Sequence, residues 1–179
     1  MRYSCIVAMD AQRGIGADGK IPWQLPGDFK YFHEVTTGKH DDGTRNVAIM
    51  GRKTWDSLSE EHKPLPARTN IVISRNADLD LPEGAMRASS LDDALTQAAG
   101  LENAGEVFVI GGGEIFRDAI HRSECARLYI TEIQNEFDCD THFPEIPEDF
   151  VERRIIGERM EHDIAYCFLI YERNGHAKS

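Results

Sequence analysis

The sequence predicts a single α/β domain, residues 1–179, with a mainly parallel sheet. Its length of 179 residues is close to that of one domain. Short apolar runs rich in β-branched residues recur along the chain. Helical patterns separate the first four of these runs, which favours crossover connections between parallel strands. The chain is 41% hydrophobic and contains 15 glycines, a composition typical of globular domains rather than of disordered or fibrous chains.

Six apolar runs and two helix starts carry this prediction. A helix is expected to begin at Pro26, because proline is favoured in the first helical turn. Another is expected after Ser90, which forms an S-x-x-D capping pattern with Asp93 ahead of an apolar helix face. No helical pattern clearly separates the last two runs, so the C-terminal strand is predicted to be antiparallel. The runs expected to form strands are residues 3–9, 47–50, 71–73, 107–110, 128–133 and 166–171.

The charge balance argues against two classes of partner. The 20 Lys and Arg against 31 Asp and Glu give a formal net charge of −11, which repels polyanions. Neither nucleic acid nor an anionic membrane is therefore an expected partner. No apolar run approaches the ~20 residues that a membrane-spanning helix needs, and the start of the chain lacks a signal-peptide pattern. We therefore expect a cytoplasmic protein.

Cysteine and histidine spacing predicts neither a disulfide framework nor a protein-bound metal. The four cysteines form no CxxC pair and are expected to stay reduced. The seven histidines form no HExxH or HxxxH pattern. Asp140 and His142 resemble a metal-binding pair only superficially, and we expect them to fix a loop by hydrogen bonds.

Polar and glycine-rich segments follow three of the expected strands, where ligands of parallel α/β sheets bind. Glycines let backbone N–H groups approach a phosphate, and arginines pair with phosphate oxygens. Each segment alone is as consistent with a turn or with solvated side chains, but their shared placement predicts a phosphate-rich nucleotide. The GxGxxG fingerprint of a Rossmann domain is absent, and arginines in place of an acidic residue favour NADPH over NADH. The segments are Arg52, Lys53 and Thr54; Ser74 and Arg75; and Gly111, Gly112 and Gly113.

Asp28 is the strongest candidate for a catalytic carboxylate. It falls on the apolar stripe that Phe32 and Val35 continue at helical spacing. The simpler interpretation is that Asp28 only complements the dipole of the first helical turn, worth under ~1 kcal/mol. Because a carboxylate among apolar side chains needs a partner, we favour a site, and its two coplanar acceptors suit the N–C–N donor edge of an aminopyrimidine or pterin. Trp23, just before it, is either core filler or a pocket wall.

The chain resembles dihydrofolate reductases, of the bacterial chromosomal type, over nearly its whole length. The segments that carry the resemblance are RGIGADGKIPWQLPGDF, IMGRKTW, LPARTNIVISR, VIGGGEIF, LYITEI, DTHFPEI and YCFLIYER. All of them in this order are far more specific than a single glycine-rich loop. The resemblance implies reduction of 7,8-dihydrofolate to tetrahydrofolate by hydride transfer from NADPH. It also implies a mixed, mainly parallel eight-stranded sheet with flanking helices and an antiparallel C-terminal strand.

The resemblance further implies which residues act on the substrate. Asp28 matches the family's active-site carboxylate, which binds the pterin and promotes protonation at N5, and Thr131 matches the threonine that supports it. Trp23 is implied as a catalytic neighbour. Arg68 matches the arginine that holds the glutamate α-carboxylate of the substrate. The residues implied around the pterin and benzoyl rings are Ile6, Phe32, Ser57, Leu58 and Ile110.

The implied cofactor site combines the three segments after strands with the stretch before Trp23. Its residues are Ala8, Ile15, Gly16, Gly19, Ile21, Arg52, Lys53, Thr54, Ser74, Arg75, Ile110, Gly111, Gly112, Gly113, Glu114, Ile115 and Phe116. The glycine-bearing stretch 14–20 is the expected closing loop. The family also implies a cis peptide bond between Gly111 and Gly112. Burial is expected to raise the pKa of Asp28 and a substrate N–H⁺ to lower it, and the sequence leaves open which effect is larger.

Three residues depart from the pattern common in the family. Phe116 replaces a tyrosine found in many bacterial relatives, Glu114 replaces an arginine of some relatives, and Cys139 replaces a common glycine. The chemistry is expected to survive these changes. Loop movement, rates and antifolate affinity depend on them.

Three alternatives remain beside this interpretation. A reductase of the same fold acting on another heterocycle, such as the aminopyrimidine reductase of riboflavin synthesis, would lack Asp28 together with Trp23 and Arg68. Intact cofactor and carboxylate positions disfavour a catalytically dead binding module. Half of a bifunctional enzyme is disfavoured because 179 residues leave no room for a synthase. We expect a monomer that binds dihydrofolate and antifolate small molecules, because the family is usually monomeric and no exposed apolar stripe is evident.

Overall fold

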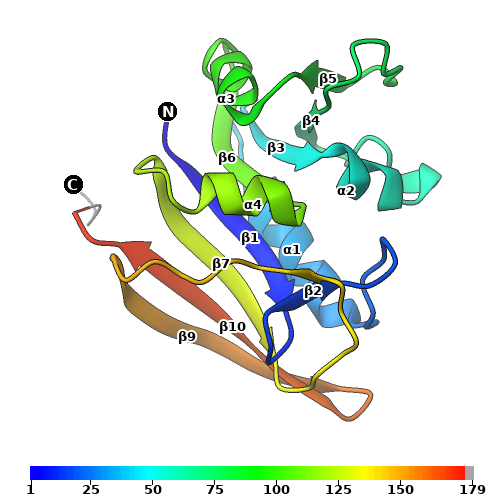
Figure 1. The fold of residues 1–179 in the computed structure, drawn as a ribbon. Coiled ribbons are helices and arrows are strands. Elements are labelled where there is room, and N and C mark those ends of the chain that lie inside the picture. Colours follow the sequence, from blue (N-terminus) through cyan, green and yellow to red (C-terminus); the bar gives the residue numbers. More distant parts are fainter. Residues whose placement is uncertain (176–179) are drawn as a thin grey trace.

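The computed structural model describes residues 1–175, apart from the side chain of Glu152, so residues 176–179 of the predicted domain lie outside the described part. Its main element is an eight-stranded sheet in the order β5-β4-β3-β6-β1-β7-β10-β9 (Figure 1). The strands are β1 (Tyr3–Met9), β3 (Arg45–Gly51), β4 (Arg68–Ile73), β5 (Ala85–Ala88), β6 (Ala104–Gly111), β7 (Cys125–Ile133), β9 (Phe150–Glu161) and β10 (Ile164–Arg173).

The strand directions confirm the predicted mixed, mainly parallel sheet. Strands β1, β3, β4, β5, β6 and β7 pair in parallel. The C-terminal strand β10 is antiparallel to β7, as the sequence predicts, and β9 is antiparallel to β10. A separate antiparallel pair, β2 (Gly14–Gly16) and β8 (Thr141–His142), joins the loop after β1 to the segment after β7.

Helices cover both faces of the sheet (Figure 1). They are α1 (Pro26–Thr37), α2 (Arg52–Ser57), α3 (Leu91–Ala99), α4 (Gly113–Ala119) and the one-turn 3-10 helix η1 (Glu60–His62). The largest apolar cluster packs beneath α3 and α4, and separate clusters lie beneath α1 and α2. In β3, Val47 and Ile49 belong to the first core, whereas Ala48 and Met50 belong to the core beside α2. Because both faces of β3 are covered, its sequence is a continuous apolar run rather than an alternating one.

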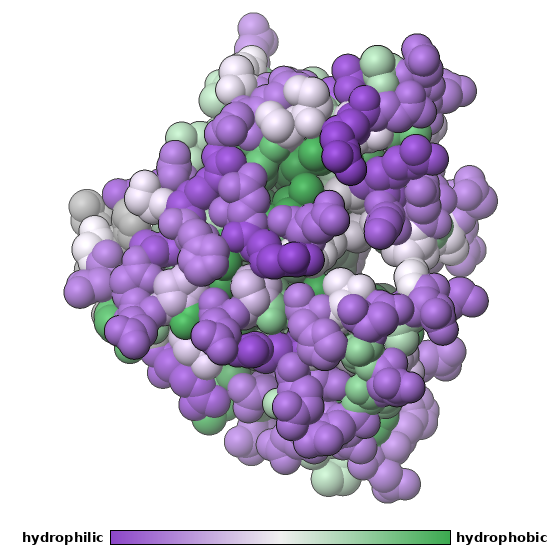
Figure 2. All heavy atoms as spheres, in the orientation of Figure 1, coloured by the Kyte–Doolittle hydropathy of each residue, from purple (hydrophilic) through white to green (hydrophobic). Residues whose placement is uncertain are grey.

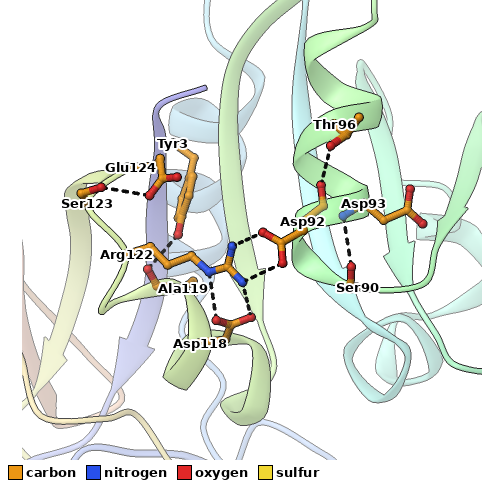
Figure 3. A network of polar contacts seen from close by, with 10 residues as sticks. All are labelled: Tyr3, Ser90, Asp92, Asp93, Thr96, Asp118, Ala119, Arg122, Ser123 and Glu124. Atoms are coloured by element: carbon orange, nitrogen blue, oxygen red, sulfur yellow. Dashed lines mark hydrogen bonds and ion pairs between the residues drawn. The ribbon is translucent and has the colours of Figure 1, made fainter.

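The α3 and α4 layer is held together by polar contacts at its ends (Figure 3). Ser90 caps α3 as the sequence predicts, with its Oγ accepting a hydrogen bond from the Asp93 backbone N–H at 3.1 Å. Arg122, in the turn after α4, donates to both carboxylate oxygens of Asp118 at 2.9 Å and pairs with Asp92 of α3. The Arg122 guanidinium therefore links the two helices.

The surface in the orientation of Figure 1 is dominated by hydrophilic residues, and apolar ones are visible mainly in recesses (Figure 2). The edge strand β9 differs, because Val151, Ile155, Ile156 and Met160 are 47–70% exposed. The expectation that no apolar stripe is exposed is therefore wrong, and it fails because β9 is not among the strands expected from apolar runs. Within residues 1–175, no helix is long and apolar enough to cross a membrane.

Candidate active site

Asp28 lies in the first turn of α1 and faces the sheet. The helix begins where the sequence predicts, with Leu25 as its N-cap and Pro26 in its first turn. The Asp28 residue is 8% exposed. From β7, Thr131 donates a hydrogen bond from its Oγ1 to Asp28 Oδ1 at 2.6 Å. Interaction with a helix dipole requires neither burial nor a hydrogen-bond donor from the sheet. The environment of Asp28 therefore favours a functional site over that simpler interpretation.

The environment of Asp28 favours its protonated form. Burial raises the pKa of this carboxyl to about 6, the hydrogen bond from Thr131 opposes that shift, and the negative charge of Glu161 adds to it. In the protein without substrate, burial is therefore the largest influence on this pKa, and the opposing effect of a substrate N–H⁺ stays a prediction. A group with this pKa exchanges its proton near neutral pH, as an acid–base catalyst must.

Apolar side chains from the sheet and two helices converge on the same face as Asp28. Ile6 is 5% exposed and belongs to an apolar cluster against which Phe32 and Ile110 pack. Phe32 and Ile110 also pack, with Leu58, against the neighbouring cluster on that face. The structure thus brings together the four apolar residues implied around the pterin and benzoyl rings.

Ser57, the remaining residue implied for the ring pocket, is placed differently. It is exposed at the end of α2. Its hydroxyl donates to the Thr54 backbone carbonyl at 2.7 Å. Its hydroxyl group therefore supplies a hydrogen bond to a backbone carbonyl in the last turn of α2.

Trp23 is both a core residue and a wall near Asp28. It is 4% exposed and belongs to the apolar cluster that includes Leu25 and Tyr166, and its ring centroid lies 5.2 Å from that of Phe137. Its indole Nε1 is buried without a hydrogen-bond partner among the described residues. A buried donor of this kind calls for a partner in the functional state.

Arg68 begins β4 as a largely buried cation. The residue is 5% exposed, and burial lowers the pKa of its guanidinium. Its Nη1 donates to Thr36 Oγ1 at 2.6 Å, its Nε donates to the Pro66 carbonyl at 2.9 Å, and its Cζ lies 5.8 Å from the centroid of the Phe32 ring. Among the side chains that the structure describes, no carboxylate lies within ion-pair distance of Arg68. Its fixed guanidinium at the margin of the ring pocket is suited to a carboxylate from a ligand.

The three segments expected to bind a phosphate-rich ligand meet at one edge of the sheet. Strands β4, β3 and β6 are parallel neighbours, so their carboxyl ends lie side by side. Arg52 and Lys53 begin α2 directly after β3, Arg75 follows β4, and all three are exposed. Arg52 Nε also approaches Asp56 Oδ2 at 3.4 Å. Ser74 is 6% exposed, and its Oγ accepts a backbone N–H of the next turn at 3.1 Å.

The turn between β6 and α4 is built from glycine. The peptide bond between Gly111 and Gly112 is cis, which confirms the bond that the resemblance implies. Gly111 has a φ of 144°, and a Cβ on it would lie 2.9 Å from Thr54 Oγ1. A Cβ on Gly113 would lie 2.9 Å from Thr141 Cγ2. This backbone therefore approaches α2 and β8 more closely than a side chain would allow.

Other residues implied for the cofactor lie on α4 and on β1. Phe116 is 2% exposed and packs edge-on against Phe143, with ring centroids 5.0 Å apart, so it is a core residue in this structure. Glu114 is exposed, whereas Ile115 packs against the main core. Ala8 lies on β1 directly opposite Thr131 of β7.

The glycine-bearing loop 14–20 is attached to the segment around β8. The Asp18 backbone N–H donates to Asp140 Oδ2 at 2.8 Å, and Thr141 Oγ1 donates to Asp140 Oδ1 at 2.7 Å. These bonds confirm that Asp140 fixes a loop. Ile15 packs against the main core, Gly16 pairs with Thr141, Gly19 has a φ of 73° and Ile21 is 49% exposed. Among the described residues, no three His, Cys, Asp or Glu side chains gather as a metal site.

Asp10 is a buried carboxylate that the sequence analysis does not single out. It is 1% exposed, and its Oδ1 accepts from the backbone N–H groups of Gln12 at 2.9 Å and Gly14 at 2.6 Å. Its Oδ2 accepts from the Phe137 N–H at 2.9 Å. Asp10 thereby ties the loop before β2 to the segment before β8. An Asp directly after a buried strand and before a turn is the signal that indicates such a role.

Known proteins match the chain over almost its whole length. The family model for dihydrofolate reductase matches residues 2–173. The dihydrofolate reductase of Heliothis virescens is 37% identical over 181 residues, covering 97% of this chain and 98% of that protein. The dihydrofolate reductase of Sus scrofa is 39% identical over 184 residues, covering 96% of this chain and 97% of that protein.

Bifunctional proteins match the same stretch. The bifunctional dihydrofolate reductase-thymidylate synthase of Daucus carota is 40% identical over 177 residues, or 96% of this chain. The chain spans 26–34% of the length of the first bifunctional relatives that it matches. The bacterial chromosomal subtype stays a prediction. Together with the carboxylate, the ring pocket and the glycine turn, these matches show that the chain belongs to the dihydrofolate reductase family.

Proposed function

We propose that the chain reduces 7,8-dihydrofolate to 5,6,7,8-tetrahydrofolate with NADPH as the hydride donor. The observation that carries this proposal is the buried Asp28 carboxylate, which is paired with Thr131 on the face of the apolar ring pocket. The names of the relatives from Heliothis virescens and Sus scrofa, both dihydrofolate reductases, support it.

The pocket binds the substrate at its two ends. Asp28 accepts hydrogen bonds from the N–C–N donor edge of the pterin, because a carboxylate offers two coplanar acceptor oxygens. Thr131 uses only one of the two lone pairs of Oδ1, so both oxygens can still accept. Phe32 and its apolar neighbours enclose the rings. Arg68 pairs with the α-carboxylate of the glutamate, since Thr36 and Pro66 already hold its guanidinium in place.

The proton that accompanies hydride addition depends on Asp28. The ionised form holds the donor edge of the pterin. Because its raised pKa of about 6 lets the carboxyl group gain and lose a proton near neutral pH, it promotes protonation of the pterin at N5, through water and the pterin tautomer, while hydride adds to C6. Thr131 fixes the orientation of the carboxyl group. Trp23 closes the wall beside it and offers its indole N–H to the bound state.

The chain's residues fit a phosphate-bearing nicotinamide nucleotide, the class of cofactor that family membership implies. Arg52, Lys53 and Arg75 are exposed cations at one sheet edge of a chain with net charge −11. Thr54 and the Gly111–Gly113 turn supply a close backbone approach beside them. We assign the 2′-phosphate of NADPH to the arginines, because guanidinium pairs bidentately with phosphate oxygens. When bound, the nicotinamide supplies the hydride.

The loop 14–20 excludes water from the reacting atoms. Its contacts to Asp140 and Asp10 hold both of its ends against the body of the protein. Positioning and closure of this kind account for most of the rate of a hydride transfer. The monomeric state and the cytoplasmic compartment stay predictions.

The test is the loss of NADPH absorbance with dihydrofolate as substrate, repeated with NADH. We expect turnover with NADPH, and a kcat/KM with NADH that is lower by about 10- to 150-fold, the range for losing a charge-assisted contact of ~1.5–3 kcal/mol. A chain that binds both ligands tightly without turnover would be a binding module, and the proposal would be wrong.

A further inference from the structure

The hairpin between β9 and β10 reaches the first turn of α1, next to Asp28 in the sequence. Glu161 is the last residue of β9. Both of its carboxylate oxygens accept from the Gly27 backbone N–H, with Oε1 at 3.2 Å and Oε2 at 3.1 Å. Gly27 directly precedes Asp28, so this single contact joins a surface hairpin to the residue before the catalytic carboxyl group.

Gly27 is shaped to receive this hairpin. A Cβ on Gly27 would lie 2.8 Å from Glu161 Oε1 and 2.4 Å from the Tyr166 hydroxyl oxygen, so position 27 has no room for a side chain. The next hairpin residue, His162, places its Nδ1 3.3 Å from the Gln24 carbonyl oxygen. The segment from Gln24 to Gly27 is therefore held from outside by the β9–β10 hairpin.

The charges around Asp28 identify which neighbour matters for its proton. From α1, Tyr31 has a pKa raised by burial, and from β10, burial and Glu161 raise the pKa of Tyr166 to about 12, so both phenols are neutral at pH 7. Arg159 of β9 is the cation in this group, and its Nη1 is engaged with the Glu158 carbonyl at 2.9 Å. Glu161 is the anion whose charge raises the pKa of Asp28.

We propose that Glu161 is a positioning residue for Asp28: its carboxylate fixes the first turn of α1 through Gly27 and places a negative charge close to the catalytic carboxyl group. The inference rests on the proposed reductase function. Glu161 thus has two effects on Asp28, which different substitutions can test separately. The hydrogen bond needs an oxygen at position 161, whereas the electrostatic effect needs a charge.

Two variants divide these effects. Glu161→Gln keeps an oxygen that can accept from Gly27 but removes the charge, whereas Glu161→Ala removes both. Glu158→Gln is the matched control, because it removes the same charge from the same strand at an exposed position on β9. The measurements are the pH dependence of the single-turnover hydride-transfer rate with NADPH and dihydrofolate, and the titration of the Asp28 carboxyl carbon by NMR in the ligand-free protein.

For Glu161→Gln we expect both apparent pKa values to fall by about 0.2–0.7 of a pH unit, the range for a charge pair partly screened by solvent. On the alkaline side the rate then falls about 1.5- to 5-fold, and below the pKa it is unchanged. Glu161→Ala is expected to show the same shift together with a lower Tm and a lower rate at every pH. The control is expected to match the wild type in both measurements.

A pH profile and NMR titration of Glu161→Gln that coincide with those of the wild type would overturn the electrostatic part of the proposal. A Glu161→Ala variant with unchanged Tm and rates would overturn the positioning part. If the wild type itself transfers no hydride, the proposed function fails, and the NMR titration still decides whether Glu161 acts on Asp28.

Discussion

Asp28 is placed where folding disfavours its charge. The pKa of about 6 lies above the ordinary value of 3.8, so the folded protein binds more protons than the unfolded chain between these pH values. The contribution of this carboxyl to stability is therefore most favourable below about pH 4 and declines as pH rises to about 6. At higher pH the ionised group lowers the free energy of unfolding by a constant amount.

Asp28→Asn is accordingly expected to stabilise the ligand-free protein. At pH 8 the free energy of unfolding should rise by roughly 1–3 kcal/mol, because the variant no longer buries an ionised carboxylate. The cost of that burial corresponds to a pKa shift of about two units at ~1.4 kcal/mol each. At pH 4 the variant and the wild type should differ little. Urea denaturation at the two pH values measures this. A variant that is less stable at pH 8 would show that burial does not dominate the environment of this carboxyl.

Arg68 provides a second test on a single side chain. Arg68→Lys keeps the charge but loses the planar donor set that Thr36 and Pro66 orient. We expect KM for dihydrofolate to rise about 10- to 100-fold, in line with ~1.5–3 kcal/mol for a charge-assisted bond. With a dihydropterin substrate that lacks the glutamate, wild type and variant should have similar kinetics. Equal losses for both substrates would place the role of Arg68 in the ring pocket instead.

The loop before β2 depends on the segment before β8. A Cβ on Gly14 would lie 2.6 Å from Cys139 Sγ and 2.9 Å from Asp10 Oδ2. Gly14→Ala should therefore disturb the closing loop and lower the hydride-transfer rate. Combining it with Cys139→Gly should restore part of that rate, because the nearer of the two obstacles is removed. The pair should show a coupling of about 0.5–3 kcal/mol in a double-mutant cycle, whereas strictly additive effects would contradict the contact.

The Arg122 guanidinium joins helices α3 and α4 at their polar ends. Arg122→Ala should lower Tm by about 2–4 °C, as expected for ~1 kcal/mol in a domain of this size, because a network of two carboxylates on one guanidinium is worth more than a single surface pair. Lys39→Ala, at an exposed cation of the loop after α1, serves as control. The kinetics of both variants should match the wild type. A Tm for Arg122→Ala equal to that of the control would mean that the network contributes nothing measurable.

The elements that could be predicted from the sequence are those with a local signal. Each of the six apolar runs lies in the sheet, and the helix starts at Pro26 and Ser90 are confirmed, because apolar strands and capping residues have patterns of their own. Strand β9 has none. Its arginines, glutamates and exposed apolar side chains alternate irregularly around a bulge between its pairs with Phe168 and Leu169. It is a strand because β10 pairs with it.

The candidate site divides in the same way. Asp28 and the residues after β3, β4 and β6 are recognisable, because the carboxylate interrupts an apolar helix face and the cations and glycines follow strands. Asp10 and Glu161 act on backbone N–H groups that are distant in sequence, up to 134 positions for Glu161. The position of Asp10 after a strand indicates its local turn contacts. Only the fold brings it to Phe137, and Glu161 to Gly27, so these two partners could not be assigned from the sequence.

At the level of the whole molecule, the exposed apolar residues of β9 raise the question of self-association. The same edge carries Arg153 and Arg154 and is interrupted by the bulge, and both features discourage pairing between sheet edges. We therefore expect sedimentation equilibrium to give a mass near 20.2 kDa over a wide range of protein concentration. A mass that rises toward twice this value with concentration would show that the edge does pair.

The fold converges on one carboxyl group: β7 supplies Thr131, α1 supplies Asp28 and the β9–β10 hairpin supplies Glu161. The most direct measurement is therefore the single-turnover hydride-transfer rate of Asp28→Asn and of the wild type across pH. We predict a loss of about 10²- to 10⁴-fold at neutral pH, the range for removing a general acid, with partial recovery as the solution becomes more acidic. A variant rate within threefold of the wild type at neutral pH would contradict the role assigned to Asp28.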